Sequence, residues 1–413
     1  MFAIRIGGHA KSLFYGLGLC LFASLCALPD VQAQKAVAVI AAADTPADTP
    51  ADLKAIGGRW YLREGKRPVY FYRDGTRFVD LFSYHTSDSN KDGIDEVRVS
   101  HDGEFLIVES QGYPNHPTAS FPNSGNPNTI RVQNFRFRLP LVPRLAKTVT
   151  RVPMGPIGMA LNGVVFFNPF EMGGLNAIEG YSEVWLDSCC GHPEQRGVYH
   201  YHKYPSCVKS PFRDDGKQHS PIIGFAFDGF PVHGPYESEK TRAQDLHGKQ
   251  SLDDCNGHTD DERGYHYHVT PGRFPYIIGG YAGVPELSNN RGLARAGSGA
   301  IQNNASGVSR ISDGIRSVKP ATAARGQTHS IRIELNPSAA RGAIADMPPD
   351  WVQIGPFEAR KISRQGSVVT VEIRIPEDAP AGVPFDCHLE FKTPQGRSDI
   401  TVMKANDVFQ VQP

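Results

Sequence analysis

The 413-residue sequence lacks any charge imbalance, because 43 lysines and arginines offset 43 aspartates and glutamates. Long runs of one charge sign are also missing, so nothing predicts a nucleic-acid partner or attraction to an anionic membrane surface. Gly-x-Ser-x-Gly, phosphate-loop and dinucleotide-binding motifs are absent, which argues against the common serine hydrolases, nucleoside triphosphatases and Rossmann enzymes. The expected partner is a small molecule or a surface ligand, and composition does not identify it.

Long hydrophobic runs are missing as well, except for one near the N-terminus. Arg5 and Lys11 precede an apolar run from Leu13 to Leu28, and Val31-Gln32-Ala33 offers small residues for cleavage. This pattern is typical of a secretory signal peptide. A retained anchor is less favoured, because spanning a bilayer takes about 20 apolar residues. We therefore expect a signal peptide at 1–33 and a periplasmic or secreted protein, with no strong membrane signal after cleavage.

Long helices are not expected, because 42 glycines and 32 prolines favour short strands and loops. Residues 34–57, rich in Ala, Asp, Thr and Pro, are predicted to be a flexible leader. Aromatic residues disappear across 287–326, which we interpret as a linker. The fold is therefore expected to be mainly β, with a β-rich domain at 58–286. Residues 327–413 alternate apolar and polar side chains, which predicts an immunoglobulin-like β-sandwich.

The most informative feature that is present is an internal repeat. Units 156–221 and 222–287 are related by a shift of 66 positions (222 minus 156), and each carries Leu-Asp, then Cys-x-x-His, then Tyr-His-Tyr-His. A partial third echo ends at His116, where Gly112-Tyr113-Pro114-Asn115-His116 resembles Gly229-Phe230-Pro231-Val232-His233. Only two full units exist, so we expect one pseudo-symmetric domain rather than a solenoid, with equivalent residues facing each other.

The duplicated tetrapeptide behind Cys-x-x-His resembles the signature of the YHYH domain family, and the resemblance extends over residues 60–285. It implies a secreted or periplasmic bacterial protein and suggests a metal site. It implies no particular reaction, substrate or metal, so those inferences depend on the residues themselves.

The histidines of both units have a spacing that suits chelation. Side chains two apart in a strand share a face, so His200 and His202 converge while the intervening tyrosine points away. Imidazole binds zinc, copper, nickel and iron, of which zinc and copper are the leading candidates. The predicted metal ligands are His192, His200, His202, His258, His266 and His268, followed by His233 and His116.

A metal-free alternative explains the same histidines and tyrosines as a buried hydrogen-bond network with carbonyls and carboxylates. Two copies of the pattern, each with a further histidine eight positions upstream, favour the metal. His219 and His247 have no counterpart in the other unit, and we expect them to be solvated.

Cysteine offers a competing chemistry. Cys189 and Cys255 begin Cys-x-x-His sequences that would suit a thiolate–imidazole zinc site, but export favours disulfides. Cys190 and Cys207 have no cysteine counterparts in the second unit, so they are predicted to pair with each other. Cys189 would then pair with Cys255 across the pseudo-symmetry axis and leave Cys387 free, although the sequence leaves this connectivity open.

Among the carboxylates, Asp228 is the candidate catalytic residue, because it replaces Asn162 of the first unit close to His233. A carboxylate near a metal activates bound water or orients a ligand histidine. Its alternative role is to set the turn before Gly229. Other carboxylates at equivalent positions are Glu171 and Glu237, and Asp187 and Asp253, the last two being expected to cap turns.

A separate calcium site is indicated by Asp88, Asn90 and Asp92, which alternate along the chain and precede a glycine as at the start of a calcium loop. The usual carboxylate at the twelfth position is replaced by Val99. The alternative is a solvated acidic turn between two strands.

These observations predict an exported, mainly β protein whose duplicated domain binds one or two transition-metal ions. Zinc with an open coordination position would favour hydrolysis, whereas copper would favour oxidation or metal carriage. Two alternatives stay open: a non-catalytic copper- or zinc-handling protein, and a metal-free module that binds a surface or a carbohydrate.

Overall fold

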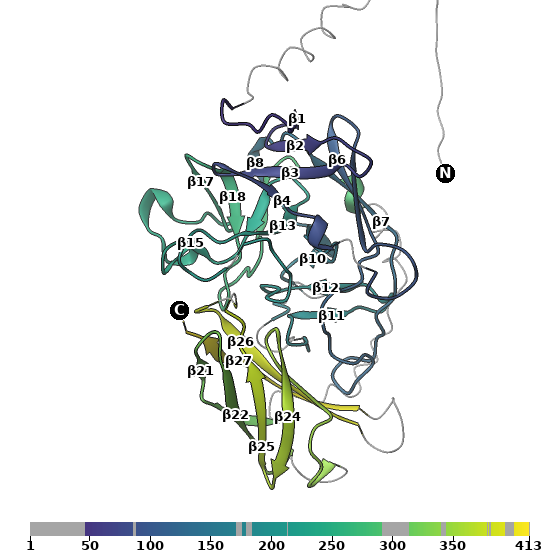
Figure 1. Ribbon diagram of the computed structural model, residues 1–413, viewed down its shortest axis with the longest axis vertical. Helices are drawn as coiled ribbons and strands as arrows, with labels where there is room; N and C mark the ends of the chain where they lie inside the picture. Colours follow the sequence, from purple (N-terminus) through teal and green to yellow (C-terminus); the bar gives the residue numbers. More distant parts are fainter. Residues whose placement is uncertain are drawn as a thin grey trace, which may run out of the picture. The chain divides into compact units, whose positions relative to one another are not determined.

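The chain forms many short β-strands (Figure 1), and the prediction of a mainly β fold is confirmed. The computed structural model describes residues 46–412 except 86–87, 171–175, 179–183, 213, 291–313, 340–343, 378, 380 and 393–399. The predicted signal peptide and the first half of the predicted leader, residues 34–45, lie outside the described residues. None of the helices found in the described ranges is long and apolar enough to cross a membrane.

Two small antiparallel sheets come first in the chain. Their turns are tight, and at Gly75 the φ of +59° is a conformation that favours glycine. Trp60, Tyr72 and Leu106 point from these sheets into the main hydrophobic core. The sheet orders are β1-β2-β3-β4 and β5-β6-β7. The bounds are β1 Lys54–Gly57, β2 Trp60–Arg63, β3 Val69–Asp74, β4 Arg77–Asp80, the 3-10 helix η2 Ser83–His85, β5 Val97–His101, β6 Phe105–Ser110 and β7 Phe135–Pro140.

An eight-stranded sheet of order β11-β12-β10-β9-β13-β14-β18-β17 contains both Tyr-His-Tyr-His sequences. Its middle strands β9 and β13 pair antiparallel with Met159 opposite Phe225, positions that are 66 residues apart. Equivalent residues therefore face each other at this central pair, as expected. Away from it, equivalent strands lie on opposite halves of the sheet, so the expectation is wrong for the Cys-x-x-His and Tyr-His-Tyr-His sequences. The bounds are β9 Pro156–Ala160, β10 Val165–Phe167, β11 Gly191–Pro193, β12 Tyr199–Tyr201, β13 Ile222–Ala226, β14 Pro231–His233, β17 Gly257–Asp260 and β18 Gly264–His268.

The turns before β11 and β17 are closed by the same hydrogen bonds. The Asp187 carboxylate accepts bonds from the backbone amides two and four positions later and from the Tyr199 hydroxyl. The Asp253 carboxylate accepts the same three bonds, with Tyr265 as the hydroxyl donor. An aspartate that satisfies the amides of its own turn fixes the direction of the following strand. β11 and β17, which carry the histidine of each Cys-x-x-His sequence, are therefore positioned alike.

Short elements complete the first part of the chain. β15 presents Glu237 beside the central sheet, and β19 supplies the backbone amide of Gly283 to Asp228. The bounds are β8 Leu145–Arg151, which pairs with β19 Gly280–Gly283, β15 Tyr236–Ser238, which pairs with β16 Thr241–Arg242, and the 3-10 helices η4 Ala243–Asp245 and η5 Gly248–Gln250.

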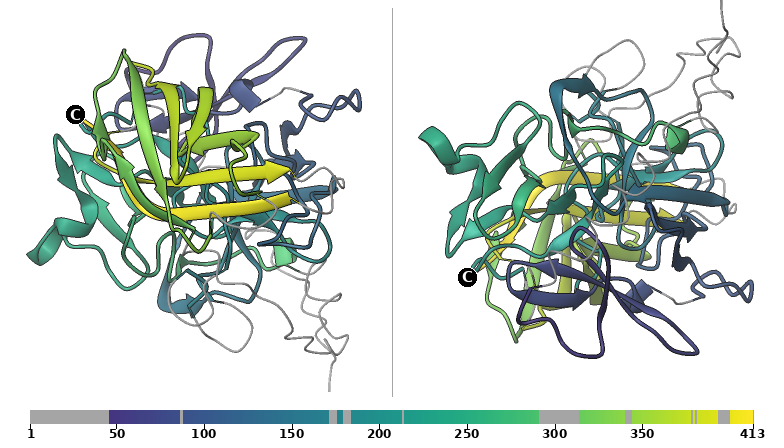
Figure 2. Two further views of the ribbon diagram at one scale, coloured as in Figure 1. Left: turned by 90° about the horizontal axis from the view of Figure 1, so that it is seen from below. Right: turned by 90° about the horizontal axis from the view of Figure 1, so that it is seen from above.

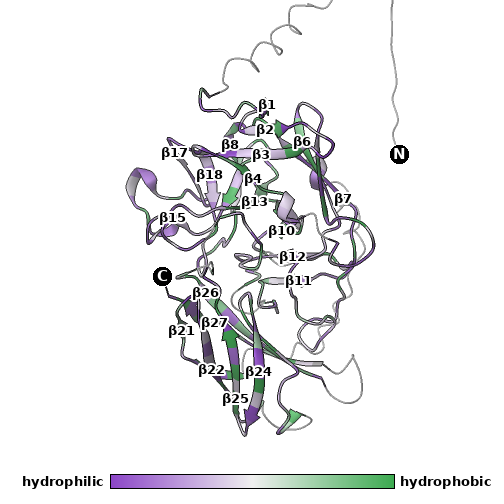
Figure 3. Cartoon of the chain, in the orientation of Figure 1, coloured by the Kyte–Doolittle hydropathy of each residue, from purple (hydrophilic) through white to green (hydrophobic). Residues whose placement is uncertain are grey.

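The C-terminal part contains eight strands in the order β20-β22-β25-β24-β23-β26-β27-β21. β26 and β27 are long and lie side by side in both views of Figure 2. Hydrophobic and hydrophilic residues mix along these strands (Figure 3), and β25 alternates buried and more exposed positions. The immunoglobulin-like topology stays a prediction. The bounds are β20 Ile315–Lys319, β21 Thr322–Ala323, β22 Thr328–Leu335, β23 Trp351–Ile354, β24 Phe357–Gln365, β25 Val368–Arg374, β26 Pro384–Lys392 and β27 Ile400–Val411.

Two predicted segment boundaries need correction. β1 occupies the end of the predicted leader, and β20 and β21 occupy the end of the predicted linker. β1, β20 and β21 are only two to five residues long, which is too short for alternation of polar and apolar residues to stand out.

One face of β26 packs against the part of the chain that contains the central sheet. The backbone amide of Ser120 donates a 2.5 Å hydrogen bond to Glu390, and Lys203 Nζ lies 3.6 Å from Asp386 Oδ1. Asp386 and Glu390 are both almost fully buried. These polar contacts explain why the C-terminal strands belong to the same compact unit as the central sheet.

Candidate metal centres

The larger of two histidine groups lies at the β17–β18 end of the central sheet. His266 and His268 alternate with Tyr267 along β18, so both imidazoles lie on one face of the strand. His258 on β17 is the direct cross-strand partner of His266, and the Nε2 atoms of these two rings are 3.2 Å apart. Strand pairing therefore brings the upstream histidine to the Tyr-His-Tyr-His pair.

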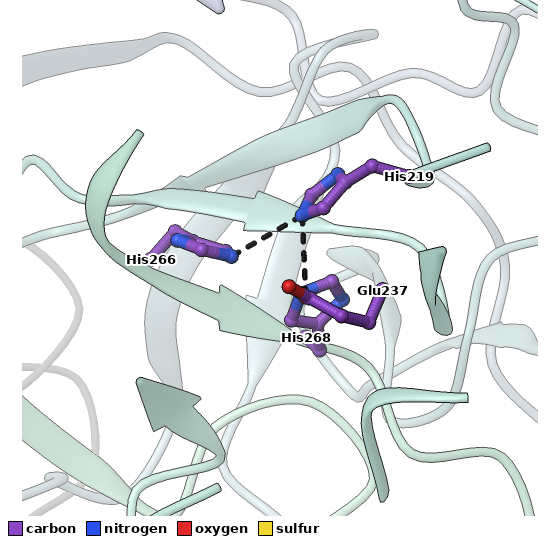
Figure 4. A group of neighbouring side chains, drawn as sticks. All are labelled: His219, Glu237, His266 and His268. Carbon is purple, nitrogen blue, oxygen red and sulfur yellow. Dashed lines mark hydrogen bonds and ion pairs between the residues drawn. The ribbon is translucent and has the colours of Figure 1, made fainter. Parts of the chain in front are cut away.

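His219 and Glu237 join this group (Figure 4). His219 Nε2 lies 3.2 Å from His266 Nε2 and 3.6 Å from Glu237 Oε2. Glu237 Oε2 is also 3.2 Å from His258 Nε2 and 3.3 Å from His268 Nε2. The prediction that His219 is solvated is wrong, because only 8% of this residue is exposed.

His233, on β14, lies beside the same rings. Its ring centroid is 4.7 Å from that of His219 and 5.1 Å from that of His266. The structure therefore places this predicted ligand within the group. We define the second centre as His219, His233, Glu237, His258, His266 and His268.

Every histidine of the second centre turns its Nδ1 atom toward a backbone carbonyl oxygen, at 2.7 to 2.9 Å. Because a carbonyl only accepts, Nδ1 carries the proton, and Nε2 of a neutral ring is left with a lone pair. Two Nε2 lone pairs that face each other cannot form a hydrogen bond without an added proton. A metal ion between them satisfies both, and metal-ligating histidines are commonly oriented by such a bond from the other ring nitrogen.

Burial disfavours positive imidazolium at the second centre, but Glu237 favours positive charge nearby. Burial, assisted by His268, lowers the pKa of His219 to about 2 and that of His266 to about 3. Burial of Glu237 is outweighed by the facing histidines, which hold the pKa of its carboxyl well below the usual range. Burial of His258 is outweighed by Glu237, which raises the pKa of that imidazole. The neutral imidazoles of His219 and His266, together with the ionised carboxylate of Glu237, suit a divalent cation.

Two facing atoms of the second centre lack a hydrogen-bond partner among the described residues. Glu237 Oε2 and His268 Nε2 are buried and 3.3 Å apart. In a neutral His268 ring the proton is on Nδ1, which donates to the carbonyl of Gly234, so that Nε2 has none to donate. Leaving a buried acceptor unsatisfied costs about 1–3 kcal/mol, and more for a charged group. A cation in contact with both atoms would remove this cost, so the residues fit a bound metal.

The first centre lies at the β11–β12 end of the sheet and consists of His192, His200 and His202. His200 Nε2 is 3.0 Å from His192 Nε2 and 3.1 Å from His202 Nε2. His200 and His202 direct Nδ1 to the backbone oxygens of Val198 and Asn168, each at 3.0 Å. Burial lowers the pKa of all three imidazoles, and that of His202 falls to about 4.

The first centre differs from the second at the positions outside the shared histidines. A phenylalanine, Phe167, occupies the position of His233, and its ring stacks on His200 with 3.8 Å between centroids. The counterpart of Glu237 is Glu171, which lies outside the described residues. The counterparts of His219, His233 and Glu237, 66 positions earlier, are Pro153, Phe167 and Glu171.

His116 does not join either centre. It lies on the tyrosine face of β12, where its Nε2 is 2.5 Å from the Tyr201 hydroxyl oxygen. One of its ring nitrogens also lies within 4.8 Å of the sulfurs of Cys189 and Cys207, but these form a disulfide and are not thiolate ligands. The predicted role of His116 beside the other metal ligands is therefore corrected, because successive side chains of β12 point to opposite faces.

The disulfide joins Cys189 and Cys207, with 5.3 Å between their Cα atoms. The predicted pairs Cys189–Cys255 and Cys190–Cys207 are therefore wrong. Cys189 precedes β11 and Cys255 precedes β17, which are the opposite edges of the central sheet. Cys190, Cys255 and Cys387 are buried free thiols.

Asp228 lies away from the histidines of the second centre. Its carboxylate accepts a 2.6 Å hydrogen bond from the Tyr267 hydroxyl and further bonds from the amides of Phe230 and Gly283. Because Tyr267 alternates with His266 and His268, this carboxylate is on the other face of β18. Asp228 thus accepts hydrogen bonds from a buried tyrosine and from backbone amides. Glu237 is the carboxylate that reaches the histidines.

The predicted calcium residues Asp88, Asn90 and Asp92 lie together in the loop that precedes β5. Asp92 Oδ2 accepts a hydrogen bond from Asn90 Nδ2, and the backbone amide of Asp92 donates to Asp88 Oδ1. This loop is remote in sequence from both histidine centres.

Two members of the second centre, Glu237 and His219, were not among the metal ligands predicted from the sequence. Glu237 carried a usable signal, because a glutamate recurs at the same repeat position, and it directly follows Tyr236 at the start of β15. His219 carried none from the repeat, since Pro153 stands at the equivalent position. Its closeness to His233 arises from the pairing of β13 with β14, which brings Ser220 near both rings.

Comparison with known proteins identifies one match. The family model described as "YHYH protein" matches residues 136–251, a segment that contains the whole first centre together with His219, His233 and Glu237. Neither the curated proteins nor the solved structures gave a match. The resemblance inferred from the repeated tetrapeptide is confirmed, and residues 136–251 of this chain are a YHYH domain.

Proposed function

We propose that this chain is an exported protein that binds one transition-metal ion at each histidine centre. The observation that carries the proposal is the pair Glu237 Oε2 and His268 Nε2, buried and facing without a hydrogen-bond partner among the described residues. A cation is the group that satisfies both. The disulfide supports export, since disulfides persist in oxidising compartments.

The ligand types and their spacing favour zinc or copper. Both centres offer imidazole nitrogens, the second adds a carboxylate, and no thiolate is among the residues that define them. Tetrahedral ligands with zinc bonds of about 2.0–2.1 Å lie about 3.3 Å apart. Contacts of 3.0 to 3.3 Å link ligand atoms within each centre. One ion per centre therefore fits with little movement.

Glu237 marks the accessible side of the second centre. Its side chain is 21% exposed, whereas that of His268 is fully buried. A small molecule or an exchanging ion would approach along Glu237, and this carboxylate is the group placed to exchange a proton there. Bound zinc would supply a Lewis acid for hydrolysis, and bound copper would supply a redox centre.

A non-catalytic metal-handling protein is the second candidate. It is favoured by the burial of the ligands, because His200, His202, His266 and His268 are each at most 2% exposed. The metal-free module is less favoured. It requires the histidines to bond only to the backbone, whereas His200 Nε2 faces two other imidazole nitrogens.

Elemental mass spectrometry tests the proposal on mature protein purified from the periplasm without chelator or polyhistidine tag. We expect zinc or copper at one ion per centre. The double variant His266→Ala and His268→Ala should lose one equivalent, and His200→Ala with His202→Ala should lose the other. His247→Ala is the matched control, since this exposed histidine belongs to neither centre.

Circular dichroism melting of the same variants establishes that they are folded when metal is counted. Protein isolated without metal that takes up none on titration would contradict the proposal. Full metal retention in both double variants would do so as well, because it would place the ion outside the two centres.

A further inference from the structure

The loop that precedes β5 is organised by its own side-chain oxygens. Asp88 accepts hydrogen bonds from the backbone amides of Asp92 and Gly93, at 2.9 and 2.8 Å. Asn90 Oδ1 accepts a 3.1 Å bond from the amide of Asp92, and Asp92 Oδ1 accepts a 2.9 Å bond from that of Ile94. Each of these oxygens retains a second lone pair. Alternating oxygen side chains followed by a glycine are typical of calcium loops.

A buried carboxylate distinguishes this loop from a solvated acidic turn. Glu96 is 0% exposed. Its Oε1 accepts a hydrogen bond from the backbone amide of Ser89, which places the carboxylate against the loop. Its Oε2 is buried with no hydrogen-bond partner in the described part of the chain. An unsatisfied buried acceptor costs about 1–3 kcal/mol, and more when it is charged, so this oxygen points to a cation.

We propose that residues 88–96 bind one calcium ion. Calcium takes 6–8 oxygen ligands, some of which are commonly backbone carbonyls and waters. Val99 stands where such loops usually have their last carboxylate, and Glu96 supplies a carboxylate three positions earlier. The protein ligands are the side chains of Asp88, Asn90, Asp92 and Glu96 and the backbone carbonyl of Ile94.

Calcium at this loop would tie β5 to β6. Gln111, which directly follows β6, donates a 2.6 Å hydrogen bond from Nε2 to Asp92 Oδ2. Its backbone amide donates to the carbonyl of Glu96 at 3.1 Å. An ion held by Asp92 and Glu96 would therefore stabilise the ends of both strands. This site is chemically independent of the histidine centres, because calcium selects oxygen ligands over imidazole.

Isothermal titration of calcium chloride into the full mature chain, with its transition metal bound, tests the site. We expect one equivalent, with a Kd on the order of 10⁻⁴–10⁻³ M or tighter, as in extracellular calcium modules. Glu96→Gln keeps the shape but removes the charge, and should weaken binding at least about tenfold. Asp92→Asn should act similarly. Its side chain is exposed, so it tests the site even where the buried substitution impairs folding.

Asp95→Asn is the matched control, because it removes a charge from an exposed side chain in the same loop. It should change the Kd by less than about twofold. Absence of saturable binding up to about 10⁻² M calcium would overturn the proposal. Equal weakening by all three substitutions would also overturn it, since it would mean diffuse attraction to acidic groups. The double variant His266→Ala and His268→Ala should bind calcium normally, and loss of calcium there would assign the binding to the second centre instead.

Discussion

The two histidine centres lie on corresponding strands but differ in the side chains that surround the shared histidines. Each has the histidine of Cys-x-x-His and the two histidines of Tyr-His-Tyr-His, brought together by one antiparallel strand pair. The second centre adds His219, His233 and Glu237, whereas the first has Phe167 stacked on His200. The repeated tetrapeptide therefore supplies the part that both candidate sites share, and residues outside it decide how many further ligands each site would offer to a bound ion.

This difference predicts unequal metal retention. The second centre offers a carboxylate and more imidazoles, and charge complementarity at a buried site stabilises a bound cation. At the first centre, the Phe167 ring covers the face of His200 and offers no ligand atom. We expect the second centre to bind the tighter ion and the first to release its ion earlier during titration with a chelator.

The largest expected effect comes from the disulfide, which ties only the first half of the sheet. Replacing Cys189 and Cys207 together by alanine should lower the free energy of unfolding by about 2–4 kcal/mol, because the crosslink restricts the unfolded chain. Urea denaturation measures this change. Hydrogen exchange should rise in β11 and β12 and stay unchanged in β17 and β18.

Reductant provides the internal control for that comparison. It should lower the stability of the natural protein and leave the double variant unaffected. An equal loss of hydrogen-exchange protection in β11–β12 and in β17–β18 would mean that the two halves of the sheet unfold as one cooperative unit. The disulfide would then not stabilise the first half selectively.

The second effect concerns His219, the proposed ligand of the second centre that has no histidine counterpart in the first repeat unit. His219→Ala should weaken metal binding at the second centre at least about tenfold, or about 1.4 kcal/mol, and bring its affinity closer to that of the first. Competition with a chromogenic chelator measures both affinities on one sample. His247→Ala should leave both unchanged. If His219→Ala leaves the metal affinity of the second centre unchanged, His219 is not a ligand. The extra ligands would then not explain a difference in affinity between the two centres.

The sequence was sufficient for the parts of each site that lie within a strand. Alternation along Tyr-His-Tyr-His predicted that His200 and His202 share a face, and the structure brings them to His192. The abundance of glycine and proline likewise predicted many short strands. These are local properties, and local spacing determines them.

The pairing of distant strands was beyond the sequence. The predicted Cys189–Cys255 pair assumed that equivalent residues meet, whereas the antiparallel pairing of β9 with β13 sends them to opposite edges of the sheet. His219 approaches His266 only because strands distant in sequence are neighbours in the sheet. Long-range register depends on the packing of the whole core, which no repeat pattern encodes.

The smallest expected effect, and the finest contrast between the halves, is at Asp228 and its counterpart Asn162. Burial raises the pKa of Asp228 to about 6, against about 3.9 in an unfolded chain. The folded protein therefore keeps this proton at pH values where the unfolded chain has lost it. The contribution of this group to stability is present below about pH 4 and is lost as the pH rises to about 6.

Asp228→Asn should remove this pH-dependent loss of stability. Asn162→Asp should introduce a similar pH-dependent loss in the first half of the sheet. A shift of about two pKa units corresponds to about 3 kcal/mol, but asparagine also gives up charge-assisted bonds worth about 1.5–3 kcal/mol, so we expect a net change on the order of 1 kcal/mol. Urea denaturation at several pH values measures it, and subtracting the natural protein at each pH cancels the other buried carboxyls. A difference that stays constant across the window would show that Asp228 is not protonated on folding. Its carboxylate would then be charged inside the sheet, where the Tyr267 hydroxyl and the backbone amides of Phe230 and Gly283 donate to it.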